Sequence, residues 1–314
     1  MTSTAQNTQT VTAASDSSLQ RGLVATSVGM VLFAVGPVLV AGAELEGLAV
    51  AAWRAWIAFA AFGIFTLFRG DASLRALKLT IGPGLAFGLG IALFFSATQV
   101  TSVANASLLT VMQPLPLLVA ARFLFGERVG GRDLAWMLLA IAGAAFMVLS
   151  ADSGGTADIR GDLLAMGGTL GGATYFVLGK RARTEIETMP FMTGMMFWGA
   201  VALTPAVLIA GQDPITTDGT EWLRLIAVGL IPGLGHMLIN YSHRSVPLVL
   251  MGLFQLLMPV AAAVLAWWFL DQSLTAGQAL GGAIVLGALA AHTLHRTGRS
   301  GAPEPPVRDE AAHS

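Results

Sequence analysis

The charged residues of this chain stand in clusters, and the stretches between the clusters are long and apolar. Windows of roughly 20 residues are nearly free of charge, and a helix of this length crosses a hydrocarbon core of ~30 Å. Only 11% of the residues are charged, against about 25% in soluble domains, while AVILMFWYC make up 55%. A soluble protein would need more polar residues to cover this apolar surface. The sequence therefore predicts an all-α integral membrane protein.

Ten stretches have the length and hydropathy of transmembrane helices, and turn residues or charges mark their ends. They lie near residues 22–41, 48–68, 80–99, 104–124, 133–150, 161–179, 190–210, 222–242, 247–269 and 275–293. The polar segment 1–21 and the proline-containing segment 294–314 are predicted to be disordered cytoplasmic tails.

Lysine and arginine positions set the orientation, because the inner loops of membrane proteins carry an excess of these residues. If the N-terminus is inside, fourteen of the seventeen lie in inner segments. Arg160 and Arg224 lie outside, and Arg54 lies within the second span. The pattern predicts a multi-pass protein of the cell membrane with both termini in the cytoplasm.

The two halves of the chain share a pattern of glycine and proline. Gly88-Leu89-Gly90 recurs 145 positions later as Gly233-Leu234-Gly235, and at the same offset Pro114 corresponds to Pro259. Five spans separate a residue from its counterpart, and because five is odd, the second half is inverted in the membrane. We therefore expect ten transmembrane helices as a 5+5 inverted repeat, a pattern typical of membrane transporters. The two predicted repeats cover residues 22–150 and 161–293.

Several short motifs resemble one family of membrane proteins. They are Trp53-Arg54, residues 97–107, Gln113-Pro114 and Gly126-Glu127-Arg128 in the first half, and residues 240–245, Met258-Pro259 and Gly282 in the second. With these motifs the chain resembles an EamA-type transporter of the drug/metabolite transporter superfamily over residues 22–293. The resemblance implies ten helices around a central cavity and secondary transport of small metabolites, often efflux. The second half departs from the family pattern at Gln272, where a glutamate is usual.

Pro114 and Pro259 fall near the middle of the fourth and ninth spans. A proline removes one helical hydrogen bond and frees the carbonyl four residues earlier, here at Thr110 and Gln255. These groups, beside the side chains of Gln113 and Gln255, would line a polar cavity at the membrane midplane and mark hinges for alternating access. The alternative is that the prolines only kink their helices.

Arg54 is the one charged side chain well inside a predicted span. An arginine at this depth costs a few kcal/mol unless it is paired or hydrated. Its fork of donors suits an anionic group of a solute. The alternatives are that it extends to the outer surface between Trp53 and Trp56, or that it pairs with Glu44 or Glu46.

His236 and Asn240 are one helical turn apart on the eighth span and share a face with Gly233. The equivalent positions of the first half are Ile91 and Phe95, so this polar stripe occurs in one half only. Such asymmetry suits solute recognition. The alternative is a hydrogen-bonded histidine with a structural role.

Two further residues are weaker candidates. Tyr175 on the sixth span is a candidate to line the cavity. Glu127 lies at the inner end of the fourth span beside Arg122 and Arg128, and we expect it to form a cytoplasmic salt bridge rather than to act in catalysis.

These observations predict a secondary transporter, in the direction of export, of a small metabolite such as an amino acid or a related compound. The alternatives are a membrane-embedded enzyme and a non-transporting receptor or scaffold. An enzyme would need a reactive constellation, but the sequence has no His-Glu-x-x-His zinc motif, no phosphate loop and no cysteine. No metal and no cofactor are therefore expected.

The expected partners are a small-molecule solute and the lipid bilayer. The net charge of −1 excludes a broad basic surface for nucleic acid. Glycines four residues apart recur along the chain and allow helices to approach closely. A pair of them on the last span, Gly277 and Gly281, is suited to a homodimer contact, so the chain is expected to be a monomer or a homodimer.

Overall fold

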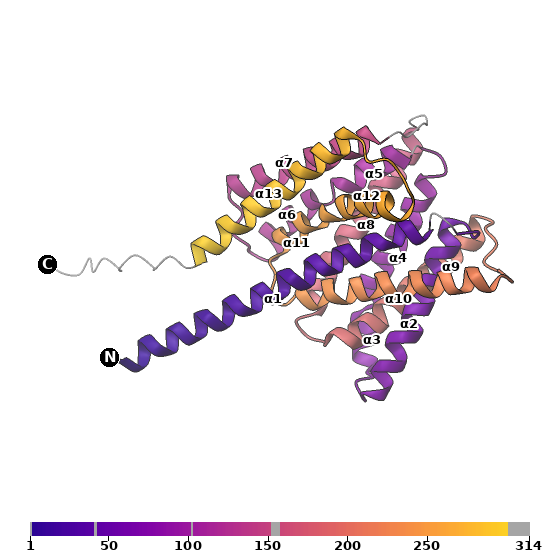
Figure 1. Ribbon diagram of the computed structural model, residues 1–314. Coiled ribbons are helices and arrows are strands. Elements are labelled where there is room, and N and C mark those ends of the chain that lie inside the picture. Colours follow the sequence, from indigo (N-terminus) through magenta and orange to yellow (C-terminus); the bar gives the residue numbers. More distant parts are fainter. Residues whose placement is uncertain (1, 41–42, 102, 152–157, 301–314) are drawn as a thin grey trace.

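A computed structural model describes residues 2–40, 43–101, 103–151 and 158–300, and every regular element in these residues is an α-helix (Figure 1). The helices are α1 Thr2–Val40, α2 Gly47–Phe68, α3 Leu74–Leu79, α4 Ile81–Ala97, α5 Val103–Val111, α6 Pro114–Leu124, α7 Gly131–Ser150, α8 Ile159–Ala182, α9 Thr188–Ile209, α10 Gly219–Ser242, α11 Leu248–Gln255, α12 Leu257–Phe269 and α13 Ala276–Ser300.

Each predicted span coincides with one of these helices or with two consecutive ones. Within the described residues, eight spans are long and apolar enough to cross a membrane. They are Ser17–Val40, Gly47–Phe68, Asn105–Leu124, Gly131–Ser150, Thr188–Ile209, Gly219–Ser242, Leu248–Phe269 and Ala276–Leu294. Helix α4 is apolar but shorter, and α8 carries charged residues near both ends. The architecture is that of an all-helical, multi-pass membrane protein.

The first and last helices extend further than the sequence predicts. Helix α1 begins at Thr2 and includes most of the predicted tail, which has no glycine or proline before Gly22 to end a helix. Extending an existing helix needs no new nucleus. Helix α13 continues to Ser300, and the rest of the C-terminal tail lies outside the described residues. The N-terminal end of α1 and the C-terminal end of α13 project on the same side of the bundle (Figure 1).

The fourth and ninth predicted spans are each divided into two helices. The chain breaks between α5 and α6 directly before Pro114, and between α11 and α12 three residues before Pro259. A proline has no N–H and its ring crowds the preceding turn, so the helical ladder is interrupted there. A Cβ added at Gly252 of α11 would lie 3.4 Å from the Cα of Pro114. The two broken helices therefore lie side by side.

The most extensive helix contacts join helices from different halves of the chain. Helix α4 packs on α8, α1 on α10, α2 on α9, and α7 on α13. Glycine residues allow α4 to pack closely on α8, and α1 on α10. A Cβ added at Gly168 of α8 would lie 3.0 Å from the carbonyl oxygen of Gly90, and one at Gly29 of α1 would lie 2.8 Å from that of Gly235. On α13, Gly281 faces α7 of the same chain, so packing within the chain accounts for its place.

Candidate functional site

Tyr175, His236 and Asn240 form a polar cluster in the interior, with exposed fractions of 2%, 5% and 0%. The side-chain amide of Asn240 donates to the hydroxyl oxygen of Tyr175 at 2.7 Å and to the carbonyl oxygen of His236 at 2.8 Å. The Tyr175 hydroxyl lies 3.4 Å from Nδ1 of His236. Packing of the second-half helices thus joins Tyr175 of α8 to the polar face of α10.

The hydrogen bonds of this cluster leave two polar atoms without a partner. The Tyr175 oxygen accepts from Asn240 and keeps one hydrogen and one lone pair, so the hydroxyl can pair with Nδ1 of His236 in either tautomer of the ring. In the described part of the chain, neither Nε2 of His236 nor Oδ1 of Asn240 has a hydrogen-bond partner. Leaving such groups buried and unpaired costs about 1–3 kcal/mol each, so each needs an explanation.

Arg54 lies beside the polar cluster, against two aromatic rings. Its guanidinium carbon is 5.6 Å from the ring centre of Phe33 on α1 and 5.8 Å from that of Phe87 on α4. Both rings also meet the His236 ring edge-to-face, with centroids 4.5 and 5.1 Å apart. Among the described residues Arg54 forms no hydrogen bond and no ion pair, so the alternative pairing with a glutamate of the preceding loop is not formed. The side chain points into the helix bundle.

Gln113 and Gln255 lie at the two helix breaks and are partly buried. Gln113 faces α8, because a Cβ added at Gly172 would lie 2.9 Å from its Oε1. Gly172 is about one turn from Tyr175, so Gln113 approaches the helix that carries part of the cluster. The Nε2 of Gln255 is buried and lacks a hydrogen-bond partner in the described residues. Within those residues, no hydrogen bond joins either glutamine to the polar cluster.

One predicted consequence of Pro114 is wrong. The carbonyl oxygen of Thr110 is not free, because it accepts a hydrogen bond from the N–H of Gln113 at 3.0 Å. The chain tightens into a turn at the break and satisfies this oxygen locally. The polar character of this break therefore comes from the side chain of Gln113.

Glu127 joins three helices at the end of the molecule predicted to be cytoplasmic. Its carboxylate accepts hydrogen bonds from the N–H groups of Leu248 at 2.7 Å and Val249 at 3.2 Å, at the start of α11. Lys180 of α8 donates to the same carboxylate at 3.1 Å. The predicted salt bridge of Glu127 is thus formed, with Lys180. A negative charge in this place also complements the positive end of the α11 dipole.

Two arginines connect the C-terminal ends of α8 and α10 through hydrogen bonds. Arg183 is only 1% exposed and donates to the carbonyl oxygens of Asn240, at 3.0 Å, and Ile186. Arg244 donates to the carbonyl oxygen of Arg183 at 2.7 Å and forms an ion pair with Glu187 at 2.9 Å. Through the backbone of Asn240, this end of the molecule is connected directly to the polar cluster.

His243 follows the last residue of α10 and is buried next to these charges. In the described residues neither of its ring nitrogens has a hydrogen-bond partner. Burial, and then the positive charges of Lys180 and Arg183, lower the pKa of His243 from 6.5 to about 3. The ring is therefore neutral at neutral pH.

The opposite end is held by two residues of the second half. Oε1 of Gln212 accepts hydrogen bonds from the N–H groups of Leu48 and Ala49, both at 3.1 Å. Glu221, with an exposed fraction of 0%, accepts one from the N–H of Glu44 at 3.0 Å. These side chains satisfy the first N–H groups of α2 and the loop before it. The two halves are thus connected at both ends of the bundle.

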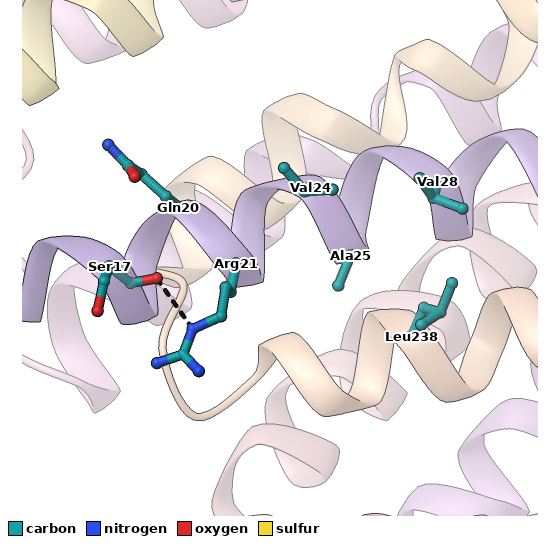
Figure 2. Close-up of a pocket in the computed structure, with 7 residues that line it drawn as sticks. All are labelled: Ser17, Gln20, Arg21, Val24, Ala25, Val28 and Leu238. Carbon is teal, nitrogen blue, oxygen red and sulfur yellow. Dashed lines mark hydrogen bonds between the residues drawn. The ribbon is translucent and has the colours of Figure 1, made fainter. Parts of the chain in front are cut away.

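Two surface pockets lie away from the polar cluster. The first runs along α1, which contributes Val24, Ala25 and Val28 to its lining, and Leu238 of the neighbouring α10 also lines it (Figure 2). Arg21 of this pocket donates to the carbonyl oxygen of Ser17 at 3.2 Å. The second lies at the end predicted to be cytoplasmic, and its lining includes Phe125, Glu127, Lys180 and Arg244. Neither pocket is lined by a residue of the polar cluster, whose three side chains are at most 5% exposed.

The aromatic neighbours of Arg54 were not predicted from the sequence. Phe87 is 5% exposed and Phe68 is 86% exposed, yet both are phenylalanines in apolar stretches. The one available signal for Phe87 is that it directly precedes the repeated Gly88. The burial of Arg183 was also missed, because a basic residue after a span is ordinarily solvated.

An all-helical, multi-pass fold with a polar cluster enclosed by apolar helices is that of an integral membrane protein. The EamA-like transporter family matches residues 20–149 and, separately, residues 159–293. Because these matches cover most of the chain, the protein belongs to the EamA-like transporter family, which confirms the resemblance predicted from the sequence.

Several individual proteins are similar to the chain. An "uncharacterized transporter" of Archaeoglobus fulgidus is 28% identical over 63% of this chain and 70% of its own length. A "probable amino-acid metabolite efflux pump" of Escherichia coli is 26% identical over 68% and 75%. The aromatic amino acid exporter YddG of Ancylobacter novellus is 26% identical over 61% and 77%. One solved crystal structure shares the fold, with a TM-score of 0.75 at 21% identity over 88% of this chain and 98% of its own.

Proposed function

We propose that this protein is a secondary transporter that exports a small metabolite, such as an amino acid or a related compound, by alternating access. The observation that carries the proposal is the polar cluster of Tyr175, His236 and Asn240, buried beside Arg54 within apolar helices. Polar and charged groups at membrane depth are rare and mark the paths of solutes. Membership of a transporter family supports transport rather than catalysis.

We also propose that ten transmembrane helices form a 5+5 inverted repeat. Two separate matches to the same family support a division at about residues 22–150 and 161–293. The helix contacts support it too. Exchanging the halves turns the contact of α4 with α8 into that of α10 with α1, and the contact of α4 with α9 into that of α10 with α2. Ten spans are an even number, so both termini lie on one side of the membrane, and the excess of Lys and Arg in inner segments supports the cytoplasmic side of the cell membrane.

The described conformation is a closed state in this mechanism. Gln212 and Glu221, which we call the outer clamp, hold the second half to the start of α2. Glu127 and Lys180, the inner clamp, hold α8 to α11 and the chain after α6. Alternating access requires one clamp to open while the other stays closed. The adjacent helix breaks before the two prolines are the proposed hinges.

The relatives support the proposed solute class and direction. The names of two relatives, an amino-acid metabolite efflux pump and an aromatic amino acid exporter, specify both amino acids and outward movement. Gln113 and Gln255, at the helix breaks, are proposed to join the polar cluster in lining the path when the site opens. The proposal takes the solute, rather than a cofactor, as the ligand of these groups.

Efflux from proteoliposomes in the absence of nucleotide tests the proposal. Vesicles with purified protein are loaded with radiolabelled amino acids, and protein-dependent efflux is expected for at least one of them. Asn240→Leu should reduce this efflux strongly. Arg160→Gln, a change at an exposed arginine outside the site, is the matched control and should leave it unchanged. Equal leakage from empty and protein-containing vesicles for the whole panel would contradict the proposed function.

A further inference from the structure

Arg54 is a positive charge inside the helix bundle without a negative partner. In the described residues its contacts are the faces of two phenylalanine rings, and it forms no ion pair there. Buried carboxylates elsewhere are already engaged, Glu127 by Lys180 and Glu221 by Arg224. An anion that binds next to a guanidinium at this depth supplies the missing negative charge and stabilises it strongly.

A second polar group lies next to the same two rings. Phe33 and Phe87 each contact both the guanidinium of Arg54 and the ring of His236. In the tautomer in which Nδ1 of His236 accepts from the Tyr175 hydroxyl, Nε2 carries the proton. Nε2 is buried and has no hydrogen-bond partner in the described residues. In this tautomer two unused donor groups lie next to the same pair of rings.

We propose that Arg54 and the Nε2–H of His236 form a subsite for the carboxylate of the transported solute. The inference rests on the proposed transport function and names the group that the solute must carry. The planar fork of an arginine matches the two oxygens of a carboxylate. The apolar rings of Phe33 and Phe87 lower the polarity around the guanidinium and so strengthen this attraction.

A hydrogen-bond acceptor, in contrast to these donors, lies one helical turn further along α10. Oδ1 of Asn240 is an acceptor, buried and unpartnered among the described residues, and it suits an N–H donor. Donors near Arg54 and an acceptor at Asn240 are the arrangement that a molecule with both a carboxylate and an amine requires. The solute class assigned by the structure is therefore an organic carboxylate, best an amino carboxylate.

Matched carboxylates and amides separate this subsite from a purely structural role for Arg54. The melting temperature of the detergent-solubilised protein is measured with L-alanine, L-phenylalanine and 3-phenylpropionate, and with the amide of each. At least one carboxylate should stabilise the wild type, and its amide should not. Arg54→Gln should lower the apparent affinity for that carboxylate by about ten- to a hundredfold, as expected for charge-assisted hydrogen bonds. Arg54→Lys should retain part of the shift.

Arg160→Gln is the matched control and should bind the carboxylates like the wild type. Amides that stabilise the wild type as well as the acids do, no shift with any carboxylate, or a full shift in folded Arg54→Gln would each overturn the subsite. Efflux from proteoliposomes is measured on the same variants. Carboxylate binding that depends on Arg54, without flux, would overturn the transport function and keep the subsite. Flux that is indifferent to Arg54→Gln would keep transport and overturn the subsite.

Discussion

At the scale of single residues, the site consists of side chains whose hydrogen-bonding capacity is only partly used. Asn240 uses its amide hydrogens on Tyr175 and on the backbone of its own helix, and its oxygen is left over. Tyr175 connects Asn240 and His236, because its hydroxyl hydrogen-bonds with both side chains. The internal hydrogen bonds hold the three side chains in place, and Nε2 of His236 and Oδ1 of Asn240 are left without a partner in the described residues.

Tyr175→Phe tests this mediating role. The change removes the hydroxyl but keeps the ring that packs against Phe87 and Phe176. Nδ1 of His236 and the side-chain amide of Asn240 each lose a hydrogen-bond partner, so both side chains are held less firmly and solute affinity should fall severalfold. Stability should fall by about 1–3 kcal/mol, the net value of two hydrogen bonds. Binding and melting temperature are measured together, and unchanged affinity in a folded variant would contradict the assignment.

The low pKa of His243 in the folded protein predicts that the stability of the protein depends on pH. Its pKa is about 3 in the folded protein and near 6.5 when unfolded, so at intermediate pH the unfolded state binds more protons. Stability is therefore fully present above pH ~6.5 and is lost as the pH falls toward 3, by up to about 1.4 kcal/mol per pH unit. His243→Gln should flatten the decline in melting temperature between pH 7 and 4. A variant that declines as steeply as the wild type would show that other groups control it.

At the scale of elements, side chains from one helix end repeatedly satisfy the start of another. Glu127 follows α6 and accepts from the first N–H groups of α11, while Gln212 follows α9 and does the same for α2. The first N–H groups of a helix have no partner within it, so each needs an acceptor from outside. Both acceptors connect the halves of the chain, which makes these helix starts the points where the bundle is held together.

Glu127 combines capping and charge, and two variants separate the roles. Glu127→Gln keeps an acceptor for α11 but loses the ion pair with Lys180, whereas Glu127→Ala loses both. Glu127→Ala should destabilise the protein by about 1–3 kcal/mol and Glu127→Gln by less. Glu185→Ala breaks the exposed pair with Arg75 and should cost at most about 1 kcal/mol. Thermal unfolding followed by tryptophan fluorescence gives the order, and equal losses in the two Glu127 variants would contradict it.

The positions of the helices could be predicted from the sequence, because the length of an apolar stretch, the turn residues at its ends and proline each act on the local chain. His236 and Asn240 could be selected as candidates because the repeat offers Ile91 and Phe95 in their place. Their partners could not be selected. Lys180 is 53 residues from Glu127, and Phe87 differs from lipid-facing phenylalanines only in its neighbours. These contacts arise from the packing of α4 and α8 between the halves, which no local pattern encodes.

At the scale of the whole molecule, the outer and inner clamps lie at opposite ends of the same bundle. Each joins the two halves, and the polar cluster lies between them, exposed at neither end. Arg183 donates a hydrogen bond to the backbone carbonyl oxygen of Asn240, so the inner end is in direct contact with the polar cluster. Opening both ends at once would let ions and solutes leak, so the two ends of a transporter must not be open at the same time.

Weakening one clamp should open the site on that side only. The chain contains no cysteine, so a single Gln255→Cys reports access without background. Combined with Lys180→Gln, it should react faster with a membrane-impermeant maleimide applied to the cytoplasmic face, and combined with Gln212→Ala, faster from the outer face. A clamp worth about 1.4 kcal/mol changes the ratio of the two states tenfold. Labelling is compared in inside-out and right-side-out vesicles. Acceleration from the same face in both double variants would contradict alternating access about this site.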